Sequence, residues 1–185
     1  MVSLAALWLP ILVAAVLVFL ASSLIHMVLP YHRTDYGMVP SEDKVMDALR
    51  PFNIPPGDYL MPAPGSASAM RDPEFIAKRK RGPVLMATVF PAGDIAMGAQ
   101  LAQWFVFCLA VGLFAAYVTS LALPAGAPYM EVFQVSSTVA FIGYGLALWE
   151  NTIWYRRAWT TTLKSNIDAL IYGLLTGGAF GWLWP

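Results

Sequence analysis

Charge is scarce in this sequence. Charged residues make up 12% of the 185 residues, whereas hydrophobic residues make up 58%. An ordinary soluble domain has about 25% charged residues, so a water-soluble fold of this chain would expose much apolar surface to water. A lipid bilayer removes that cost, because lipid covers the apolar outer face of a helix bundle. The composition therefore predicts an integral membrane protein.

Cysteine and the common catalytic motifs are also scarce. The single cysteine, Cys108, excludes an intramolecular disulfide, and its apolar surroundings predict a buried, unreactive thiol. The sequence has no glycine-rich phosphate loop, no His-Glu-x-x-His zinc motif and no Gly-x-Ser-x-Gly nucleophile motif. We therefore predict no catalytic residues and no cofactor, and a non-enzymatic role is favoured over an enzyme.

Four apolar runs are long enough to cross a bilayer. About 20 residues of helix span a hydrocarbon core of about 30 Å, and lipid offers backbone groups no partner, which favours helices. The prediction is an all-α membrane protein with four transmembrane helices, treated as one membrane domain over residues 1–185. The predicted helices cover residues 4–29, 97–123, 129–149 and 166–184.

Basic residues are confined to two stretches. Eight of the 11 lie in the predicted loop of residues 31–96, and the other three lie between residues 156 and 164. Cytoplasmic loops are enriched in Lys and Arg, so both stretches are predicted to be cytoplasmic and both termini periplasmic. The seven tryptophans lie near predicted helix ends, where indole rings prefer the headgroup layer.

The long cytoplasmic loop is predicted to be largely irregular, with one or two short helices. Residues 41–50 favour a helix capped by Ser41, and residues 73–81 favour a helix capped by Asp72. Residues 84–90 are rich in β-forming side chains and predict a short strand or an interfacial strip. Prolines and turn residues elsewhere, as in Ile54–Tyr59, predict little further regular structure.

A run of four basic residues in this loop favours contact with lipid. Such a run attracts anionic headgroups by about 1 kcal/mol per residue near a membrane surface. No groove-reading pattern accompanies it, so nucleic acid is not a predicted partner. The residues assigned to lipid headgroups are Lys78, Arg79, Lys80, Arg81, Arg156 and Arg157.

Three glycines recur at every fourth position of the predicted fourth helix. Gly173, Gly177 and Gly181 therefore share one stripe, where the backbone of another helix can approach closely. We expect helix packing at this glycine stripe. The sequence leaves open whether the partner helix belongs to the same chain or to another copy.

Two carboxylates lie near the cytoplasmic ends of predicted helices, where a charge usually faces protein or water. Local pairing is one expectation: Lys164 lies four residues before Asp168 on one helical face, and Arg157 can fold back to Glu150. A proton or cation path is the alternative. The residues of that path are Glu150, Asp168, Gln103 and Gln134.

Two histidines flank the inner end of the first predicted helix. His26 and His32 are separated by Pro30, so we do not expect them to stack on one helix face or to act as paired haem ligands. Imidazole and carboxylate together suit zinc or iron, and a metal site would draw on His26, His32 and Asp35. The simpler expectation is that His32 meets lipid headgroups.

Five segments carry a family resemblance: HMVLPYHR at residues 26–33, IPPGDY at 54–59, IWYRRAWTTTLK at 153–164, LIYGLLT at 170–176 and GWLWP at 181–185. They resemble a group of short bacterial four-span inner-membrane proteins of unknown function. The resemblance covers most of the chain. It implies a bacterial inner membrane and adds no catalytic residues.

Three hypotheses for function follow. The first is a non-enzymatic accessory or scaffold subunit that packs, through the glycine stripe, against a larger membrane complex or against a second copy of itself. The second is a small transporter or channel with a proton or cation path. The third is a lipid-active membrane enzyme centred on His26, His32 and Asp35. The expected partners are membrane lipids with anionic headgroups and either a homo-oligomer or a larger membrane complex.

Overall fold

The structure is a computed structural model that describes residues 2–94 and 96–185. Met1 and Ile95, which the predicted domain and loop include, lie outside the described residues. The chain forms two compact units, one of residues up to 37 together with 96–185, and one of residues 38–95. Most of the region that the sequence treats as a loop therefore forms a compact unit of its own.

Four long helices form the first unit. Their bounds are Trp8–Ser23 for α1, Gly98–Ala122 for α4, Tyr129–Gly145 for α5 and Trp159–Leu183 for α7. A 3₁₀ turn precedes α1 at Leu4–Leu7, and a π-helical turn extends it over Leu24–Val28. Beyond α5, the helical path continues through a 3₁₀ turn at Leu146–Leu148 into α6 (Trp149–Tyr155).

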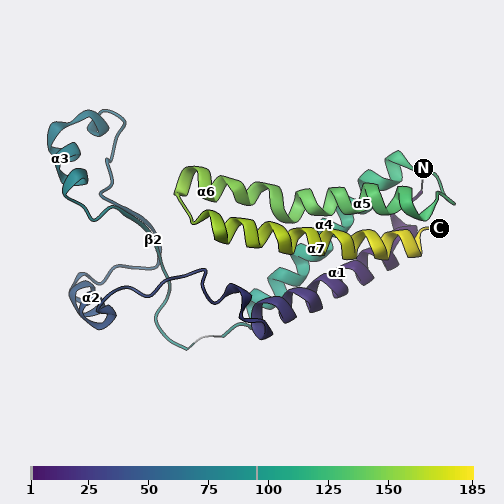
Figure 1. Cartoon of the computed structure of the whole chain (residues 1–185), viewed down its shortest axis with the longest axis horizontal. Coiled ribbons are helices and arrows are strands. Elements are labelled where there is room, and N and C mark those ends of the chain that lie inside the picture. Colours follow the sequence, from purple (N-terminus) through teal and green to yellow (C-terminus); the bar gives the residue numbers. More distant parts are fainter. Residues whose placement is uncertain (1, 95) are drawn as a thin grey trace. The chain divides into compact units, whose positions relative to one another are not determined.

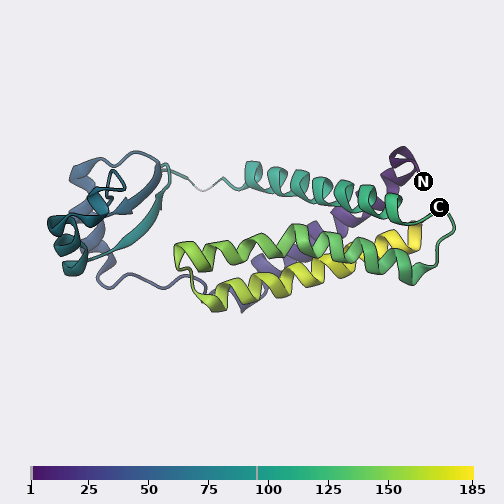
Figure 2. The same ribbon diagram turned by 90° about the horizontal axis from the view of Figure 1, so that it is seen from above.

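Successive long helices of this unit run in opposite directions (Figure 1). α5 and α7 lie side by side, and α1 packs against both α4 and α7 (Figure 2). The start of α1 and the end of α7 meet at one end of the bundle, where the fully buried Leu7 and Phe180 belong to one apolar cluster. Cys108 is buried in a second apolar cluster, as the sequence predicts.

Three helical segments are long and apolar enough to cross a membrane: Leu4–Val28, Gly98–Ala122 and Tyr129–Tyr155. They correspond to the first three predicted helices, which makes the chain a multi-pass membrane protein. The third extends past its predicted end at residue 149. α7 is not among the three, because Asn166, Asp168 and several glycines and threonines lower its mean hydropathy.

α7 also begins earlier than predicted, at Trp159 rather than at residue 166. The polar residues of its first turns are buried rather than left outside the helix. Thr161 and Thr162 are almost fully buried, and the Thr162 hydroxyl hydrogen-bonds the hydroxyl of Thr152 on α6. Packing against α6 therefore extends the helix into a stretch that hydropathy alone assigns to a loop.

The glycine stripe packs against α5 of the same chain. A Cβ added at Gly177 would lie 2.8 Å from the Cβ of Ser137, and one added at Gly181 would lie 2.7 Å from the ring of Tyr129. A Cβ at Gly173 would lie 3.0 Å from the backbone oxygen of Ser137. These distances leave no room for a side chain, so glycine sets the close approach of the two helices. The partner helix that the sequence leaves open is α5.

The second unit contains more regular structure than the sequence predicts. Two strands, β1 (Gly57–Met61) and β2 (Leu85–Val89), form an antiparallel sheet with Gly57 opposite Val89. The sequence indicates β2 but not β1, because its prolines and glycine made the Ile54–Tyr59 segment a predicted turn. The strand partner comes from a distant part of the loop, which local propensity does not reveal.

Two short helices of this unit lie where the sequence predicts them: α2 at Glu42–Leu49 and α3 at Pro73–Arg81. Asp72 caps α3 by accepting a hydrogen bond from the backbone N–H of Glu74 at 2.9 Å. The predicted cap of α2 is wrong. Ser41 has a left-handed backbone (φ 55°, ψ 47°) and no side-chain capping bond, whereas a capping residue usually has an extended backbone.

A single methyl group tests the packing of the glycine stripe. Gly177→Ala should lower the stability of the protein by about 1–3 kcal/mol, the usual cost of overpacking, because the new Cβ meets Ser137 and Phe133. Gly178→Ala is the matched control, since its Cβ would meet only the Tyr129 hydroxyl, at 4.0 Å. Thermal unfolding in mild detergent measures both, and equal melting temperatures for the two variants would contradict this packing.

Candidate metal centre

The chain reverses direction at the end of α1. The N–H of Leu29 donates to the carbonyl of Leu24 at 3.1 Å, five residues back, which closes the π-helical turn. Pro30 has no N–H to continue the helix and favours an extended backbone at the residue before it. Leu29 has that backbone (φ −77°, ψ 142°), and a 3₁₀ turn follows. The result is that His32 folds back toward His26.

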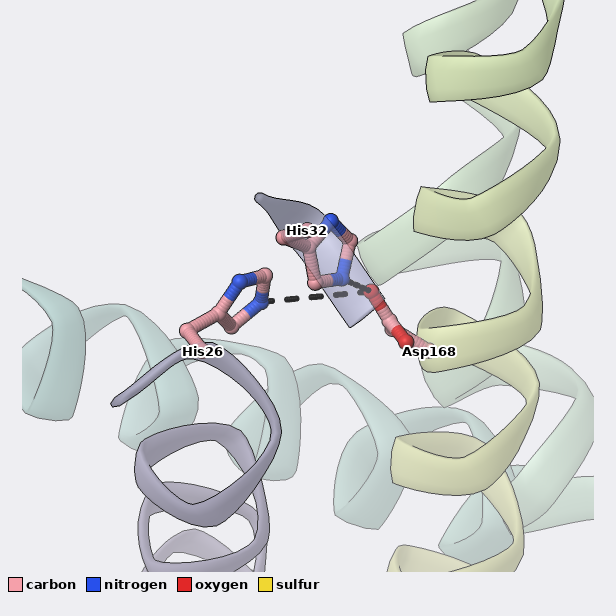
Figure 3. A group of neighbouring side chains, drawn as sticks. All are labelled: His26, His32 and Asp168. Carbon is pink, nitrogen blue, oxygen red and sulfur yellow. Dashed lines mark hydrogen bonds and ion pairs between the residues drawn. The ribbon is translucent and has the colours of Figure 1, made fainter. Parts of the chain in front are cut away.

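The two histidine rings stack on one another. Their centroids lie 4.2 Å apart with an interplanar angle of 29°, and Figure 3 shows the two rings next to each other. The residues share no continuous helix face, as their spacing predicts, and the rings nevertheless stack because the chain folds back between them. The reversal at Pro30 brings together two side chains that a continuous helix would separate.

Asp168 of α7 faces both histidines (Figure 3). Its Oδ2 atom lies 2.8 Å from Nε2 of His32 and 3.9 Å from Nε2 of His26. One ligand atom from each of the three residues lies within 4.8 Å of the others. Two imidazole nitrogens and one carboxylate oxygen form a donor set that suits zinc or iron. We call these three residues the His–Asp centre.

Burial differs across the His–Asp centre. The side chains of Asp168, His32 and His26 are 4%, 13% and 48% exposed, respectively. The second carboxylate oxygen of Asp168, Oδ1, is buried and has no hydrogen-bond partner among the described residues. Leaving a buried polar group unpaired costs about 1–3 kcal/mol, and more for a charged group. A cation bound at this carboxylate would compensate part of that cost.

Asp35 orients His32 from the opposite side. Its Oδ2 atom lies 2.6 Å from Nδ1 of His32, and its Oδ1 atom accepts a hydrogen bond from Nζ of Lys164 at 2.8 Å. Burial alone would raise the pKa of Asp35, but the hydrogen bonds from Lys164 and His32 outweigh it and hold this pKa below its usual value. A carboxylate on Nδ1 fixes the ring and presents Nε2, the usual arrangement around a metal-binding histidine.

The predicted metal set is therefore changed in one member. The sequence analysis proposed His26, His32 and Asp35, whereas the structure places Asp168 beside both Nε2 atoms and Asp35 behind His32. The sequence assigned Asp168 to an ion path and missed its proximity to the histidines. The signal for it was weak: Asp168 is the one carboxylate in the last apolar run.

A proton occupies the contact that a metal would use. Nε2 of His32 and Oδ2 of Asp168 lie 2.8 Å apart, and a hydrogen bond between a ring nitrogen and a carboxyl oxygen needs a proton on one of them. A metal ion that binds both atoms takes the place of that proton. Metal binding at this centre is therefore coupled to proton release.

The other predicted ion-path residues do not join Asp168. Gln103 on α4, Gln134 on α5 and Glu150 on α6 are exposed, whereas Asp168 is buried. These four side chains thus line no common path within one chain.

The local ion pairs that the sequence predicts do not form either. Lys164 donates to Asp35 and also to the backbone oxygen of Tyr31, at 2.8 Å each, because the reversal after α1 places this segment over the start of α7. Arg157 donates to the hydroxyl of Tyr36. Among the residues that the structure describes, Glu150 takes part in no ion pair.

The function of this centre has to be inferred from its own geometry. Comparisons of the chain with protein-family models, with curated proteins and with solved structures found no match. What the geometry provides is a buried carboxylate, two stacked imidazoles and a second carboxylate that orients one of them.

The Asp35–Lys164 contact predicts a pH-dependent stability. Asp35→Asn should destabilise the protein by about 1.5–3 kcal/mol at neutral pH, the range for hydrogen bonds to charged groups. A carboxyl with a lowered pKa stabilises the fold at pH values above its ordinary pKa of 3.8. This stabilisation is lost as pH falls through the lowered pKa. The difference in the free energy of unfolding between the wild type and the variant should therefore become smaller as the solution is acidified.

Chemical denaturation in detergent at a series of pH values measures this gap. Asp43→Asn is the control, because Asp43 is an exposed carboxylate on α2. A gap for Asp35→Asn that stays constant down to pH 3, or that matches the control, would argue against the ion pair.

Proposed function

We propose that this chain is a four-span bacterial inner-membrane protein that binds one divalent transition-metal ion at His26, His32 and Asp168. The observation that carries the proposal is the position of the buried Asp168 carboxylate, 2.8 Å and 3.9 Å from the Nε2 atoms of the two histidines. Zn²⁺ and Fe²⁺ accept this donor set. Three protein ligands leave a coordination position open, which is the pattern of catalytic rather than structural zinc sites.

Exposed tryptophans support a membrane position for all four long helices. Trp8 and Trp182 lie at the end of the bundle where the chain's first and last helices meet, and Trp154 and Trp159 lie at the opposite end. Indole rings prefer the headgroup layers, so the two pairs fit two faces of one bilayer. α7 has 25 residues, or about 37 Å of helix at 1.5 Å per residue, enough to cross the hydrocarbon core.

Basic residues support the orientation. Arg156, Arg157 and Lys164 lie at the same end of the bundle as the His–Asp centre. The positive-inside rule therefore favours a cytoplasmic position for that end and a periplasmic position for both termini. The same rule favours the cytoplasm for Lys78–Arg81, whose exposed side chains at the end of α3 would bind anionic lipid headgroups.

The metal proposal changes the order of the three functional hypotheses. A scaffold role loses its expected contact surface, because α5 covers the glycine stripe. A transport role has no path within one chain, because three of its four residues are exposed. A metal ion with an open coordination position at a membrane face favours the third hypothesis, a membrane enzyme that acts on lipid.

Metal binding can be measured directly on the detergent-solubilised protein with a tag that contains no histidine. We expect one Co²⁺ or Zn²⁺ per chain. Asp168→Asn and His32→Ala each remove one metal ligand and should weaken metal binding by at least about 10–100-fold. Glu131→Gln is the matched control, since this exposed carboxylate lies at the start of α5. Isothermal titration calorimetry in buffers of different ionisation enthalpy should also detect proton release.

Binding that is equally strong in Asp168→Asn and in the control would place the metal elsewhere and overturn the proposed centre. Binding without proton release would contradict the exchange of the His32–Asp168 proton for a metal ion.

The four-span topology can be tested with single introduced cysteines. Cys108 is buried, so it is left in place. With a membrane-impermeant maleimide applied to spheroplasts, Ala125→Cys in the α4–α5 turn and Trp182→Cys near the end of α7 should be labelled. Ala158→Cys, between α6 and α7, should be labelled only after lysis. Labelling of Ala125→Cys but not of Trp182→Cys in intact spheroplasts would mean that α7 does not cross the membrane.

A further inference from the structure

A second feature adjoins the His–Asp centre. A pocket of about 240 Å³ lies between the end of α1 and the start of α4, and His26 forms part of its wall. Most of the remaining wall is apolar and comes from Met27, Met97, Leu101 and Trp104. Pockets that enclose a whole drug-sized ligand measure about 300–1,000 Å³. This pocket therefore has room for one segment of a ligand rather than for a whole two-chain lipid.

The polar groups of the pocket wall are already hydrogen-bonded. The hydroxyls of Ser22 and Ser23 both donate to the backbone oxygen of Phe19, at 2.9 Å and 2.8 Å. The indole N–H of Trp104 donates to the Ser22 hydroxyl at 2.8 Å. These bonds remove the donors that a polar ligand would need, so the wall presents apolar surface. Of the residues that line the pocket, His26 is the one that titrates.

His26 belongs to the pocket and to the His–Asp centre at once. Its Nε2 atom faces Asp168 at 3.9 Å and the hydroxyl of Tyr172 at 3.4 Å, while its ring stacks on His32. About half of the His26 side chain is exposed, in contrast to the buried Asp168. The pocket therefore borders one of the three metal ligands.

Charge decides which end group fits there. With a divalent ion bound and both histidines neutral, the ion and Lys164 outweigh the two carboxylates, Asp35 and Asp168, by one positive charge. A singly charged anion at the open coordination position would neutralise this excess, and a carboxylate oxygen is a ligand that zinc and iron accept. An uncharged end group would leave the excess charge in place.

Resting on the proposed metal site, we infer that the pocket and the metal ion together bind a long-chain carboxylate such as a fatty acid. Part of the alkyl chain occupies the pocket between α1 and α4. The carboxylate occupies the open position of the metal ion beside His26. The substrates of the proposed membrane enzyme are therefore single-chain anionic amphiphiles.

The experiment uses the full-length protein in mild detergent, loaded with Zn²⁺, and a palmitate that carries a photoreactive diazirine on its chain. Illumination followed by peptide mass spectrometry should place the cross-link on residues 22–27 or 97–104. Excess unlabelled palmitate should remove the signal, whereas hexadecanol, which lacks the charge, should not. Removing the zinc with a chelator should lower cross-linking by about tenfold or more.

Two substitutions on α4 distinguish palmitate binding in the pocket from palmitate binding on the lipid-facing surface. Leu101→Trp fills the pocket and should lower cross-linking about tenfold while the zinc content stays at the wild-type level. Leu113→Trp is the control, because Leu113 is exposed on the same helix and does not line the pocket. Its cross-linking should match the wild type.

The zinc content, measured separately by elemental analysis, distinguishes the two ways to fail. A zinc-loaded protein whose cross-linking is unchanged by chelation, by Leu101→Trp or by palmitate excess overturns this inference and leaves the metal site standing. Competition by hexadecanol as effective as by palmitate also overturns it. A wild-type protein that binds no zinc overturns the metal site itself, and this inference with it.

Discussion

The hydrogen bond between His32 and Asp168 joins two parts of the chain that are 136 positions apart. It forms because Pro30 ends the first helix and turns the following residues back over α7, where Lys164 holds Asp35 and Tyr31. α1 and α7 are thereby connected at their polar ends as well as along their apolar faces. The meeting of the two histidines at Asp168 depends on this reversal, since His26 precedes it and His32 follows it.

Close helix packing supplies the other half of the geometry. On the far side of α7, Gly145 of α5 lies so near Ala169 that an added Cβ would sit 2.8 Å from the Ala169 Cβ. Asp168, the neighbouring residue, is thus held toward α1 while α5 covers the other face. The glycine stripe further along α7 continues the same contact. The stripe, whose partner helix the sequence left open, therefore holds α7 against α5 of the same chain.

The sequence predicted those helices whose position depends on interactions between residues near one another in the chain. Apolar length located α1, α4 and α5, and the Asp72 cap located α3. It did not predict contacts that depend on distant partners. The pairing of β1 depends on β2, which lies far along the chain. The burial of the first turn of α7 depends on α6, which lies across the preceding turn. The histidines were noticed for their chemistry, but their partner Asp168 required the fold.

The burial of Asp168 is costly, and its partners show how the chain compensates it. A carboxylate in the low-dielectric interior is stable only with a compensating charge or proton. Without metal, the proton shared with His32 serves that purpose, and Asp35 and Lys164 balance one another alongside. Replacing that proton by a divalent ion adds charge that those residues do not balance. The ion that carries this charge is bound by His26, the one residue of the largely apolar pocket wall that titrates, which is why an anion with an apolar chain is the complement of this site.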